Sequence, residues 1–506
     1  MKKEKQINNF NFNSKDNSNN VKNLDDEYKL ANLTGLKPIF FKNNFDRFME
    51  NLNKNFKQLN QKSVIFIQGG NEIPRHDTDT VFFTFYQNPN FYYLTGLNEP
   101  GFTLVIDVAK KERFLFMIMP DEKKSIYQRV PSLDEISKNY EIQCKKMDEI
   151  WEFINNINPE KIYRLSGVNS DSKRKVETSS FNPPEPYNKL IERLDDNTMV
   201  WELLSDTRVI KSDEEINLIR YAVNVCCNIH KEIIKNIEPG KNERNIEMEF
   251  SKLSKKELYT RELPYGYISA SGKNSCIIHY DNNDSIMDKS GLILMDMGLK
   301  LAGYCVDITS TVPVNGKFSE YQKNIYNIVL EANRNIINKI KPGIYWTTLH
   351  TFAEMIILKG LQKYQLLSSK YTVDEMIEKR VSYYFFPHGL GHFIGLDNHD
   401  VGGYLSFTPV RPTEKGINKL RTSRQLMKNM VLTVEPGIYF NEYLLNQAFN
   451  DPNVNKYFVK EEILKNYINI GGIRIEDMVV VKENGCEVLS SNLVRKTEEI
   501  EELMRK

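Results

Sequence analysis

The sequence has no excess of charge of either sign. Lys and Arg number 68 and Asp and Glu number 67, which leaves a formal net charge of +1 over 506 residues. Proteins that bind nucleic acid or anionic membrane surfaces usually carry a basic excess, so this balance argues against both classes. Apolar runs such as FLFMIM at 114–119 fall far short of the about 20 residues that cross a bilayer. We therefore expect neither a nucleic-acid partner nor a membrane partner.

The N-terminus lacks the apolar segment of a secretory signal. Residues 1–25 are polar and rich in Asn, which predicts a disordered tail. Cysteine is sparse, with six in the chain and no pair at CxxC spacing. Without a signal, this usage is typical of reduced thiols, so we predict a cytoplasmic location and no cysteine chemistry at the centre of function.

Two folded regions are expected after the tail. Residues 26–200 alternate between strand-like and helix-like segments, which predicts a mixed α/β domain. Residues 205–506 begin with a capping box, Ser212 and Glu215, ahead of an amphipathic helix that runs toward Gly240. Helices and apolar strands then alternate, which predicts an α+β domain with a mostly antiparallel sheet. The expected strands are 63–69, 102–108, 113–120, 161–167, 291–298, 303–314, 430–440 and 471–481.

Acidic residues interrupt the apolar strands of the second region. Asp296 lies in LILMDMG, Asp307 in GYCVDIT, Glu435 directly after MVLTV, and Glu476 in GGIRIEDMVVV. A buried carboxylate without a partner costs several kcal/mol, so neutral residues are expected at such positions. Taken singly, each acid can be explained as a turn cap or as the partner of a nearby Arg or Lys.

The spacing of the first two acids suggests that they meet. If residues 291–314 form a hairpin centred between Leu301 and Ala302, Asp296 and Asp307 stand directly opposite each other on one face. Like charges in that arrangement repel, and a metal ion between them removes the repulsion. The four acids carry a formal charge of −4, which two divalent cations would balance.

Histidine is also concentrated near one point of the chain. Three of the seven histidines, His388, His392 and His399, lie within the segment PHGLGHFIGLDNHDVGG at 387–403. One imidazole added to the four carboxylates makes a mainly oxygen-donor set, which suits Mn²⁺ and also admits Co²⁺ or Zn²⁺. We therefore predict two divalent metal ions, with Mn²⁺ preferred.

The order of these motifs resembles that of the pita-bread metallopeptidases (family M24B), and within them the prolidase branch of Xaa-Pro dipeptidases. The motifs are MDMG, CVDITST, HGLGHFIGLDNHDVGG, VLTVEPGIYF and GIRIEDMVVV. The first half is similar to the creatinase-like N-terminal domain of that family, here residues 26–200, and residues 205–506 would form the pita-bread catalytic domain. The segments LRTSRQL and YFNEYLLNQAFNDP resemble eukaryotic prolidase more than the aminopeptidase P branch.

The resemblance implies roles for individual residues. The implied metal ligands are Asp296, Asp307, His392, Glu435 and Glu476. The implied catalytic residues are Glu435, His399, His388 and His279. The implied substrate-binding residues are Arg421, His388, His399, His279, Tyr265 and Arg474, the last also orienting the metal carboxylates. Simpler explanations stay open for two of them: a solvated loop cation for Arg421 and core packing for Tyr265.

The implied reaction is hydrolysis of Xaa-Pro dipeptides by hydroxide bound to two metal ions, with Glu435 as proton acceptor. A small Xaa-Pro peptide would be the substrate, the protein would form a homodimer through its N-terminal domains, and collagen degradation would be one context. Two alternatives remain, namely an aminopeptidase P acting on longer Xaa-Pro peptides and a metal-free partner-binding protein.

Some residues fall outside this pattern. His230 and His350 lie in expected helices and His76 in a polar turn, so we interpret them as packing or surface residues. Lys273 in ASGKN replaces an acid that the family commonly carries, and Asn398 replaces an aliphatic residue. Neither is a ligand position, so we expect the departures to alter local charge rather than catalysis.

Overall fold

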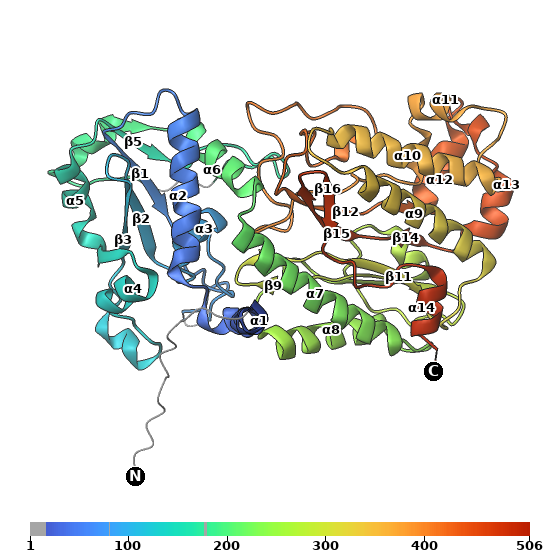
Figure 1. Cartoon of the computed structure of the whole chain (residues 1–506), viewed down its shortest axis with the longest axis horizontal. Helices are drawn as coiled ribbons and strands as arrows, with labels where there is room; N and C mark the ends of the chain where they lie inside the picture. Colours follow the sequence, from blue (N-terminus) through green and yellow to red (C-terminus); the bar gives the residue numbers. More distant parts are fainter. Residues whose placement is uncertain (1–16, 80, 177–179, 506) are drawn as a thin grey trace, which may run out of the picture.

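The computed structural model describes residues 17–505 except 80 and 177–179. It divides into two domains lying side by side (Figure 1). Residues 1–16 of the expected tail lie outside the described residues. The prediction of disorder is wrong for residues 17–25, which begin helix α1 (Asn17–Thr34). The later part of this helix is anchored on the C-terminal domain, where Asn32 donates to the carbonyls of Leu258 and Lys300. Within the described part of the chain, no helix combines the length and apolarity needed to cross a membrane.

The N-terminal domain is built on a six-stranded mixed sheet with strand order β4-β3-β2-β1-β5-β6. Its strands are β1 (Ser63–Gln68), β2 (Phe102–Asp107), β3 (Glu112–Met117), β4 (Gln143–Lys146), β5 (Lys161–Arg164) and β6 (Leu194–Asp195). Its helices are α2 (Pro38–Asn55), α3 (Pro89–Thr95), α4 (Leu133–Tyr140), α5 (Ile150–Ile157) and α6 (Met199–Val209).

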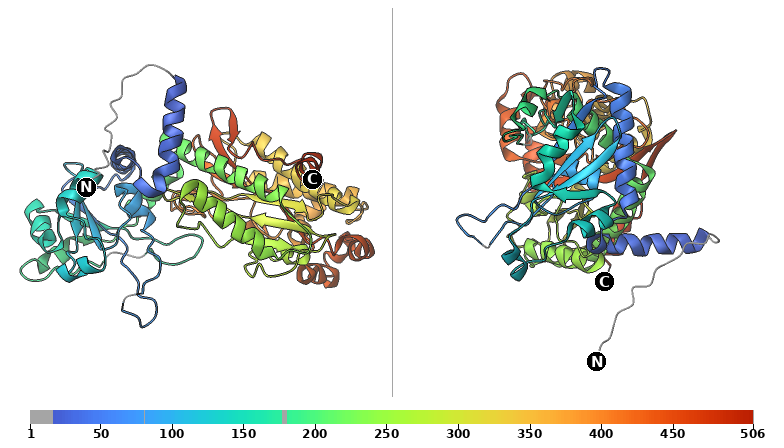
Figure 2. Two further views of the ribbon diagram at one scale, coloured as in Figure 1. Left: turned by 90° about the horizontal axis from the view of Figure 1, so that it is seen from below. Right: turned by 90° about the vertical axis from the view of Figure 1, so that its left-hand side faces the viewer.

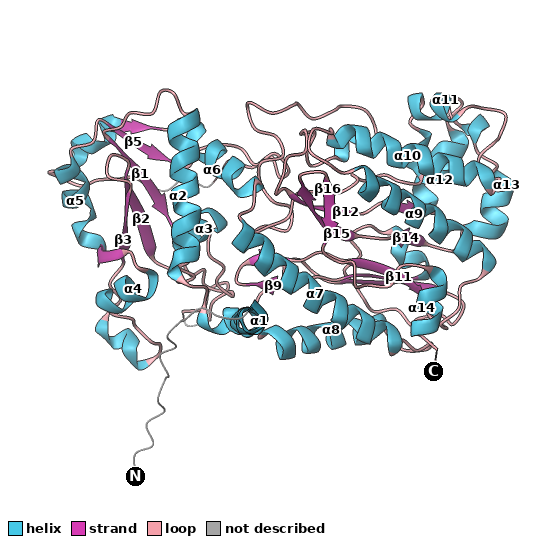
Figure 3. Cartoon of the chain, in the orientation of Figure 1, coloured by secondary structure: helices cyan, strands magenta, loops and turns pink. Residues whose placement is uncertain are grey.

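Both faces of this sheet are covered, as Figure 3 shows. Val64 and Phe66 of β1 belong to a core cluster with Ile154 of α5, whereas Ile65 and Ile67 belong to the larger core that includes α2. Because side chains alternate between the faces of a strand, burial on both sides explains the continuous apolar run of β1.

The four strands expected in this domain correspond to β1, β2, β3 and β5. Strand β4 was not expected, because the segment before it, 132–143, begins with a helical pattern and no strand was predicted after it. The helix ends at Tyr140 since Glu141 adopts the left-handed conformation, and the chain then adds β4 parallel to β3. The expected domain boundary, between residues 200 and 205, falls inside α6, which packs against α2.

The C-terminal domain places long helices outside a set of antiparallel strands (Figure 2). Its helices are α7 (Asp213–Lys235), α8 (Glu243–Leu258), α9 (Glu320–Lys339), α10 (Trp346–Lys363), α11 (Val373–Glu378), α12 (Glu442–Asn450), α13 (Lys460–Glu462) and α14 (Thr497–Leu503). The predicted capping box at Ser212 and Glu215 opens α7. The helix ends at Lys235, short of the expected Gly240, and Pro239 has no N–H with which to continue the ladder to the Lys235 carbonyl.

The strands of this domain form short antiparallel ladders. They are β7 (Ile268–Ser271), β8 (Leu292–Asp296), β9 (Lys300–Leu301), β10 (Tyr304–Cys305), β11 (Thr309–Pro313), β12 (Val431–Val434), β13 (Gly437–Tyr439), β14 (Gly472–Arg474), β15 (Asp477–Lys482) and β16 (Gly485–Val488). The mostly antiparallel α+β arrangement expected from the sequence is confirmed.

The register of the 291–314 hairpin differs from the one expected. Leu301 pairs with Tyr304, so the turn is centred between Ala302 and Gly303 rather than between Leu301 and Ala302. Both turn residues have positive φ, 46° and 85°, which suits a two-residue turn that follows the twist of the strands. Asp296 therefore faces Thr309 instead of Asp307. The slip is two residues, so both acids still lie on the same face.

Candidate metal centre

Three of the predicted acids lie on a single line across the C-terminal sheet. Asp296 pairs with Thr309, and Thr309 forms a bridge with Glu476. Val434 of β12 pairs with Asp477 of β15, and Gly437 of β13 pairs with Arg474 of β14. Both pairs follow the same register, which is interrupted at residues 435–436 and 475–476. Continuing that register across the break sets Glu435 opposite Glu476. Directly opposed residues share a face, so the side chains of the line point the same way.

The remaining acid and the ligand histidine join the same face. Asp307 precedes Thr309 by two residues, and a period of two keeps it on that face. His392 lies opposite Thr433 of β12: the amide of Thr433 donates to the His392 carbonyl at 2.9 Å, and its hydroxyl accepts from the His392 amide at 3.1 Å. Thr433 in turn precedes Glu435 by two residues. Alternation along the strands thus gathers five residues that are distant in sequence.

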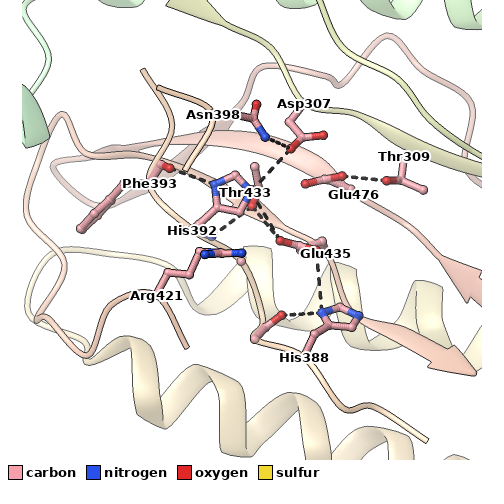
Figure 4. Close-up of polar contacts among 12 residues, drawn as sticks. Asp307, Thr309, His388, His392, Phe393, Asn398, Arg421, Thr433, Glu435 and Glu476 are labelled. Carbon is pink, nitrogen blue, oxygen red and sulfur yellow. Dashed lines mark hydrogen bonds and ion pairs between the residues drawn. The ribbon is translucent and has the colours of Figure 1, made fainter. Parts of the chain in front are cut away.

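The side chains meet at short range (Figure 4). Atoms of Asp307, His392 and Glu476 lie within 4.8 Å of one another, an arrangement that could hold a metal ion. His392 Nε2 is 3.5 Å from Asp307 Oδ2 and 3.6 Å from Glu435 Oε1. His392 Nδ1 lies 2.9 Å from the carbonyl of Phe393, a contact that leaves Nε2 to face the acids.

Burial makes this group of charges unfavourable by itself. Glu476 is 1% exposed and Asp296 is 9% exposed. Burial and the neighbouring Asp307 charge raise the pKa of Asp296 to about 7. Burial, together with Asp307 and Glu435, raises the pKa of Glu476 well above its usual value. Burial would also raise the pKa of Asp307, but contacts with His392, Tyr265 and Asn398 outweigh it and lower that pKa.

One oxygen of the site lacks a partner. Asp296 Oδ2 accepts from Arg474 Nη2 at 2.5 Å, whereas Asp296 Oδ1 is buried with no hydrogen-bond partner among the described residues. An orphaned buried carboxylate oxygen is costly, and a cation is the partner that a carboxylate binds most strongly. The donor set of four carboxylates and one imidazole therefore fits divalent metal ions.

A hydrogen-bonded frame holds the acids in place. Tyr265 donates to Asp307 Oδ1 at 2.6 Å, and Thr309 donates to Glu476 Oε2 at 2.7 Å. Arg474, predicted to orient the carboxylates, also donates to Tyr439 Oη at 2.8 Å. Such contacts fix the orientation of ligand carboxylates and limit how far they can move apart.

The other predicted histidines border this group. His388 Nδ1 lies 3.8 Å from Glu435 Oε2, and His388 Nε2 lies 2.9 Å from Tyr439 Oη. The rings of His392 and His399 have centroids 4.5 Å apart. Burial and the positive charge of Arg474 lower the pKa of His388 to about 3, and burial with His392 lowers that of His399 to about 2. Both rings are therefore neutral near pH 7.

The last two predicted residues lie at the edge of the site. His279 is one of the exposed residues, although part of its side chain is covered. This partial burial and the positive charges of Arg474 and Arg421 lower its pKa. Arg421 points toward His392 and Glu435 in Figure 4. Its side chain is 30% exposed, and Nη1 lies 3.1 Å from Asp171 Oδ2.

Several site contacts were not expected from the sequence. Asn398, noted only as a departure, donates to Asp307 Oδ2 at 2.8 Å. Thr309 could have been found from its position two residues after Asp307, and Tyr439 belongs to the PGIYF motif. Lys273 is on the surface, where its Nζ lies 2.7 Å from Glu442 Oε1. It contacts none of the four carboxylates of the metal centre.

The three remaining histidines fit their expected roles. His230 is buried, and Nε2 lies 2.9 Å from the Met297 carbonyl. His350 is buried against Phe386, with ring centroids 5.3 Å apart. His76 is exposed on the segment between β1 and α3.

The chain has similar sequences and folds among known proteins. Residues 217–483 match the sequence pattern of metallopeptidase family M24. The chain belongs to this family. Residues 41–163 match the aminopeptidase P N-terminal domain, which precedes the M24 region in this chain.

The M24 relatives cover almost the whole chain. Xaa-Pro dipeptidase of Mus musculus is 36% identical over 484 residues, which span 94% of this chain and 96% of the relative. Xaa-Pro dipeptidase of Homo sapiens is 35% identical over 467 residues, spanning 91% and 92%. A probable Xaa-Pro aminopeptidase of Phaeosphaeria nodorum is 32% identical over 448 residues, spanning 88% and 91%. These relatives and the M24 match identify the protein as a metallopeptidase.

Solved structures support the same fold. An Escherichia coli aminopeptidase P variant in complex with substrate superposes with a TM-score of 0.73 at 27% identity, covering 93% of this chain and 98% of that one. A zinc-substituted form of the E. coli enzyme in complex with product gives a TM-score of 0.73 at 28% identity, covering 93% and 99%. The two-domain arrangement of an accessory α/β domain and a pita-bread domain is thereby confirmed.

Proposed function

We propose that this metallopeptidase hydrolyses Xaa-Pro dipeptides. The observation that supports the proposal best is the buried line of carboxylates, which faces His392 and needs cations for its balance. The names of the mammalian relatives, Xaa-Pro dipeptidases, supply the substrate class. The fungal relatives and the E. coli structure are named for aminopeptidase activity, so that reaction is the alternative to be tested.

Two divalent cations are the proposed cofactors, held by Asp296, Asp307, His392, Glu435 and Glu476. Four carboxylates, Arg474 and a metal-bound hydroxide would have a combined formal charge of −4, which two divalent ions would balance. Mn²⁺ is the preferred ion because the donors are mainly oxygen, with Co²⁺ and Zn²⁺ as substitutes. The bound ions would polarise the scissile carbonyl and lower the pKa of a water molecule.

Glu435 is the proposed proton acceptor. It lies at the open side of the line, with 17% of its side chain exposed, whereas Glu476 is fully enclosed. Burial raises the pKa of Glu435, and His392 and Arg474 partly offset that effect. A carboxylate with a raised pKa is well suited to take a proton from water and to release it to the leaving nitrogen. The neutral rings of His388 and His399 would donate or accept hydrogen bonds beside it.

The Xaa-Pro bond favours such a site for a simple reason. The nitrogen of proline has no N–H, so an enzyme that grips its substrate through that group loses the contact. The residues of this site would hold cations that polarise the carbonyl, and Glu435 would accept the proton of the water, so no N–H of the substrate is needed. A dipeptidase must also bind the free carboxylate that follows proline, and Arg421 is the proposed partner because a guanidinium can bind a carboxylate through two parallel hydrogen bonds. Tyr265, which donates to Asp307, is a further proposed substrate-binding residue. His279, whose pKa is lowered by partial burial and by the charges of Arg474 and Arg421, is another.

A homodimer in the cytoplasm is the proposed state. Support for the dimer comes from segment 71–86 of the N-terminal domain, whose large apolar side chains are exposed: Ile73, Val81, Phe82, Phe83 and Tyr86. A second copy would cover them. Support for the compartment comes from the six cysteines, all free of disulfides.

The function is tested by comparing turnover of Gly-Pro and Gly-Pro-Ala by Mn²⁺-loaded protein. We expect Gly-Pro to be the better substrate, with no turnover after chelation. Preference for Gly-Pro-Ala would replace the dipeptidase with an aminopeptidase P. If turnover of both peptides persisted after chelation, the reaction would not depend on metal.

A further inference from the structure

An acid of the N-terminal domain contacts the arginine proposed to bind substrate. Asp171 lies between β5 and β6, far in sequence from the metal centre. Its Oδ2 is 3.1 Å from Arg421 Nη1, and its Oδ1 accepts from Arg411 Nη2 at 2.9 Å. The Asp171 side chain is 19% exposed. One carboxylate therefore bridges two arginines across the domain boundary.

The turn that presents Asp171 is well defined. Asn169 Oδ1 accepts from the amides of Asp171 and Ser172 at 2.9 and 3.0 Å. The backbone closes the turn through an isolated bridge between Val168 and Lys175. A side chain that caps its own turn in this way restricts the backbone, so Asp171 is offered from a fixed position.

Arg411 is fixed from the other side. Nη1 donates to the carbonyl of Leu420 at 2.6 Å, directly before Arg421, and Nη2 also donates to the carbonyl of Ser170 at 3.1 Å. Its guanidinium lies over the ring of Tyr404, 4.4 Å from the centroid. Arg411 thus ties the turn of Asp171 to the backbone that carries Arg421.

We propose that Asp171 is a positioning residue that orients Arg421 for the terminal carboxylate of the substrate. This inference rests on the proposed function. Asp171 occupies one nitrogen of the guanidinium, and an arginine can still offer its other N–H groups to a second carboxylate. An arginine held in this way loses less conformational freedom when the substrate binds, which strengthens binding without a new contact.

Simple attraction predicts the opposite effect. Asp171 is negative and lies beside the place where a negative carboxylate would bind, so removing its charge should improve binding if Coulomb forces alone decided. The positioning role predicts weaker binding instead. The sign of the change therefore separates the two explanations.

The experiment uses full-length Mn²⁺-loaded protein with Gly-Pro and with Gly-Pro-amide, which has no terminal carboxylate. The variants are Asp171→Asn, Asp171→Glu and Arg421→Lys, with Asp196→Asn as a control. Asp196 lies in the same domain as Asp171, and its Oδ2 is 2.5 Å from Arg164 Nη2. This ion pair does not include Arg421.

For Asp171→Asn we expect KM for Gly-Pro to rise by about threefold to tenfold, with kcat nearly unchanged. The reason is that the Arg421 side chain must then lose its conformational freedom when the substrate binds. KM for Gly-Pro-amide should stay the same, Asp171→Glu should restore part of the loss, and Asp196→Asn should match the parent. In an Arg421→Lys background, Asp171→Asn should have little further effect.

Three results would overturn the proposal: an unchanged or lower KM for Gly-Pro in Asp171→Asn, an equal loss for both substrates, or full additivity with Arg421→Lys. The activity of the parent protein distinguishes a failure of the positioning role from a failure of the proposed function. Turnover of Gly-Pro by the parent with an unaffected Asp171→Asn variant rejects only the positioning role. A parent that cleaves Gly-Pro-Ala but not Gly-Pro rejects the dipeptidase function, and the carboxylate role of Arg421 with it.

Discussion

Glu476 and Asp477 are adjacent acids on opposite faces of one chain segment, and they have opposite electrostatic surroundings. Both are buried, at 1% and 0% exposure. Asp477 lies 2.9 Å from both Arg495 and Arg334, and these arginines outweigh burial and lower its pKa. Glu476 accepts from the Thr309 hydroxyl, and burial together with the charges of Asp307, Glu435 and Asp296 raises its pKa.

The difference between the two faces shows which buried charge the protein balances by itself. On the Asp477 face, arginines of the chain supply the positive charge, so the ion pairs belong to the fold. On the Glu476 face, Arg474 binds Asp296, and Arg421 approaches Glu435 from the edge, so the four acids outnumber the positive charges that face them. Buried acids that the chain leaves unbalanced are expected at a site that acquires cations from outside.

The largest expected effect is the loss of activity in Asp307→Ala. Removing this carboxylate takes away a proposed ligand shared by the centre, while the apolar strands around it remain. We expect kcat/KM for Gly-Pro to fall by more than about a thousandfold, about 4 kcal/mol of transition-state stabilisation. Steady-state kinetics measures the loss of turnover, and circular dichroism measures whether the variant remains folded. Near-parental turnover in a folded variant would refute the assignment.

The second prediction reverses the roles of the two neighbours. Asp477→Asn should lower the free energy of unfolding by about 3–5 kcal/mol, because it leaves the buried Arg495 without its partner carboxylate. Glu476→Gln should leave the metal-free protein at least as stable as the parent, because it removes a repelled charge. Urea denaturation of chelated protein measures both, and equal destabilisation would show that the two faces are alike.

The third prediction concerns pH and metal-free protein. The pKa of Asp296 is raised to about 7 by burial and by Asp307, above the value near 3.9 of an unfolded chain. The folded state therefore binds this proton more tightly, so stability should fall as pH rises from about 4 to about 7 and should level off above that. Melting temperatures between pH 5.5 and 8.5 should show the fall, and Asp296→Asn should reduce it. A rise in stability over that range would contradict the assigned direction.

The smallest effect is expected on the surface. Lys273 and Glu442 are 59% and 60% exposed, and exposed ion pairs contribute little. Lys273→Ala should change the free energy of unfolding by less than about 0.5 kcal/mol and leave kcat/KM unchanged. A clear loss of activity would mean that this departure from the family pattern tunes the site after all.

The sequence predicted much of this molecule because the relevant signals are local. The apolar strands, the capping box at Ser212 and the acids set in apolar runs are all visible along the chain. The period of two along a strand is sufficient to place Asp307 and Thr309 on one face. The exact hairpin register was not available in this way, because it depends on the positive φ values at Ala302 and Gly303.

Contacts between distant segments were also beyond the sequence. Asp171 lies in a polar stretch, NSDSKRK, that has the appearance of an ordinary loop. Its contact with Arg421 depends on how the two domains pack. Asn398 was visible as a departure, but its hydrogen bond to Asp307 requires the fold that brings the two segments together.

The most direct test of the account is the number of metal ions that the protein binds. Chelated protein would be titrated with Mn²⁺ by calorimetry, and the bound metal counted after dialysis. The account predicts two Mn²⁺ per chain in the parent and in Lys273→Ala, and fewer in Glu476→Gln. A parent protein that binds no Mn²⁺, or a Glu476→Gln variant that binds as many ions as the parent with equal affinity, would contradict the claim that cations balance the buried acids.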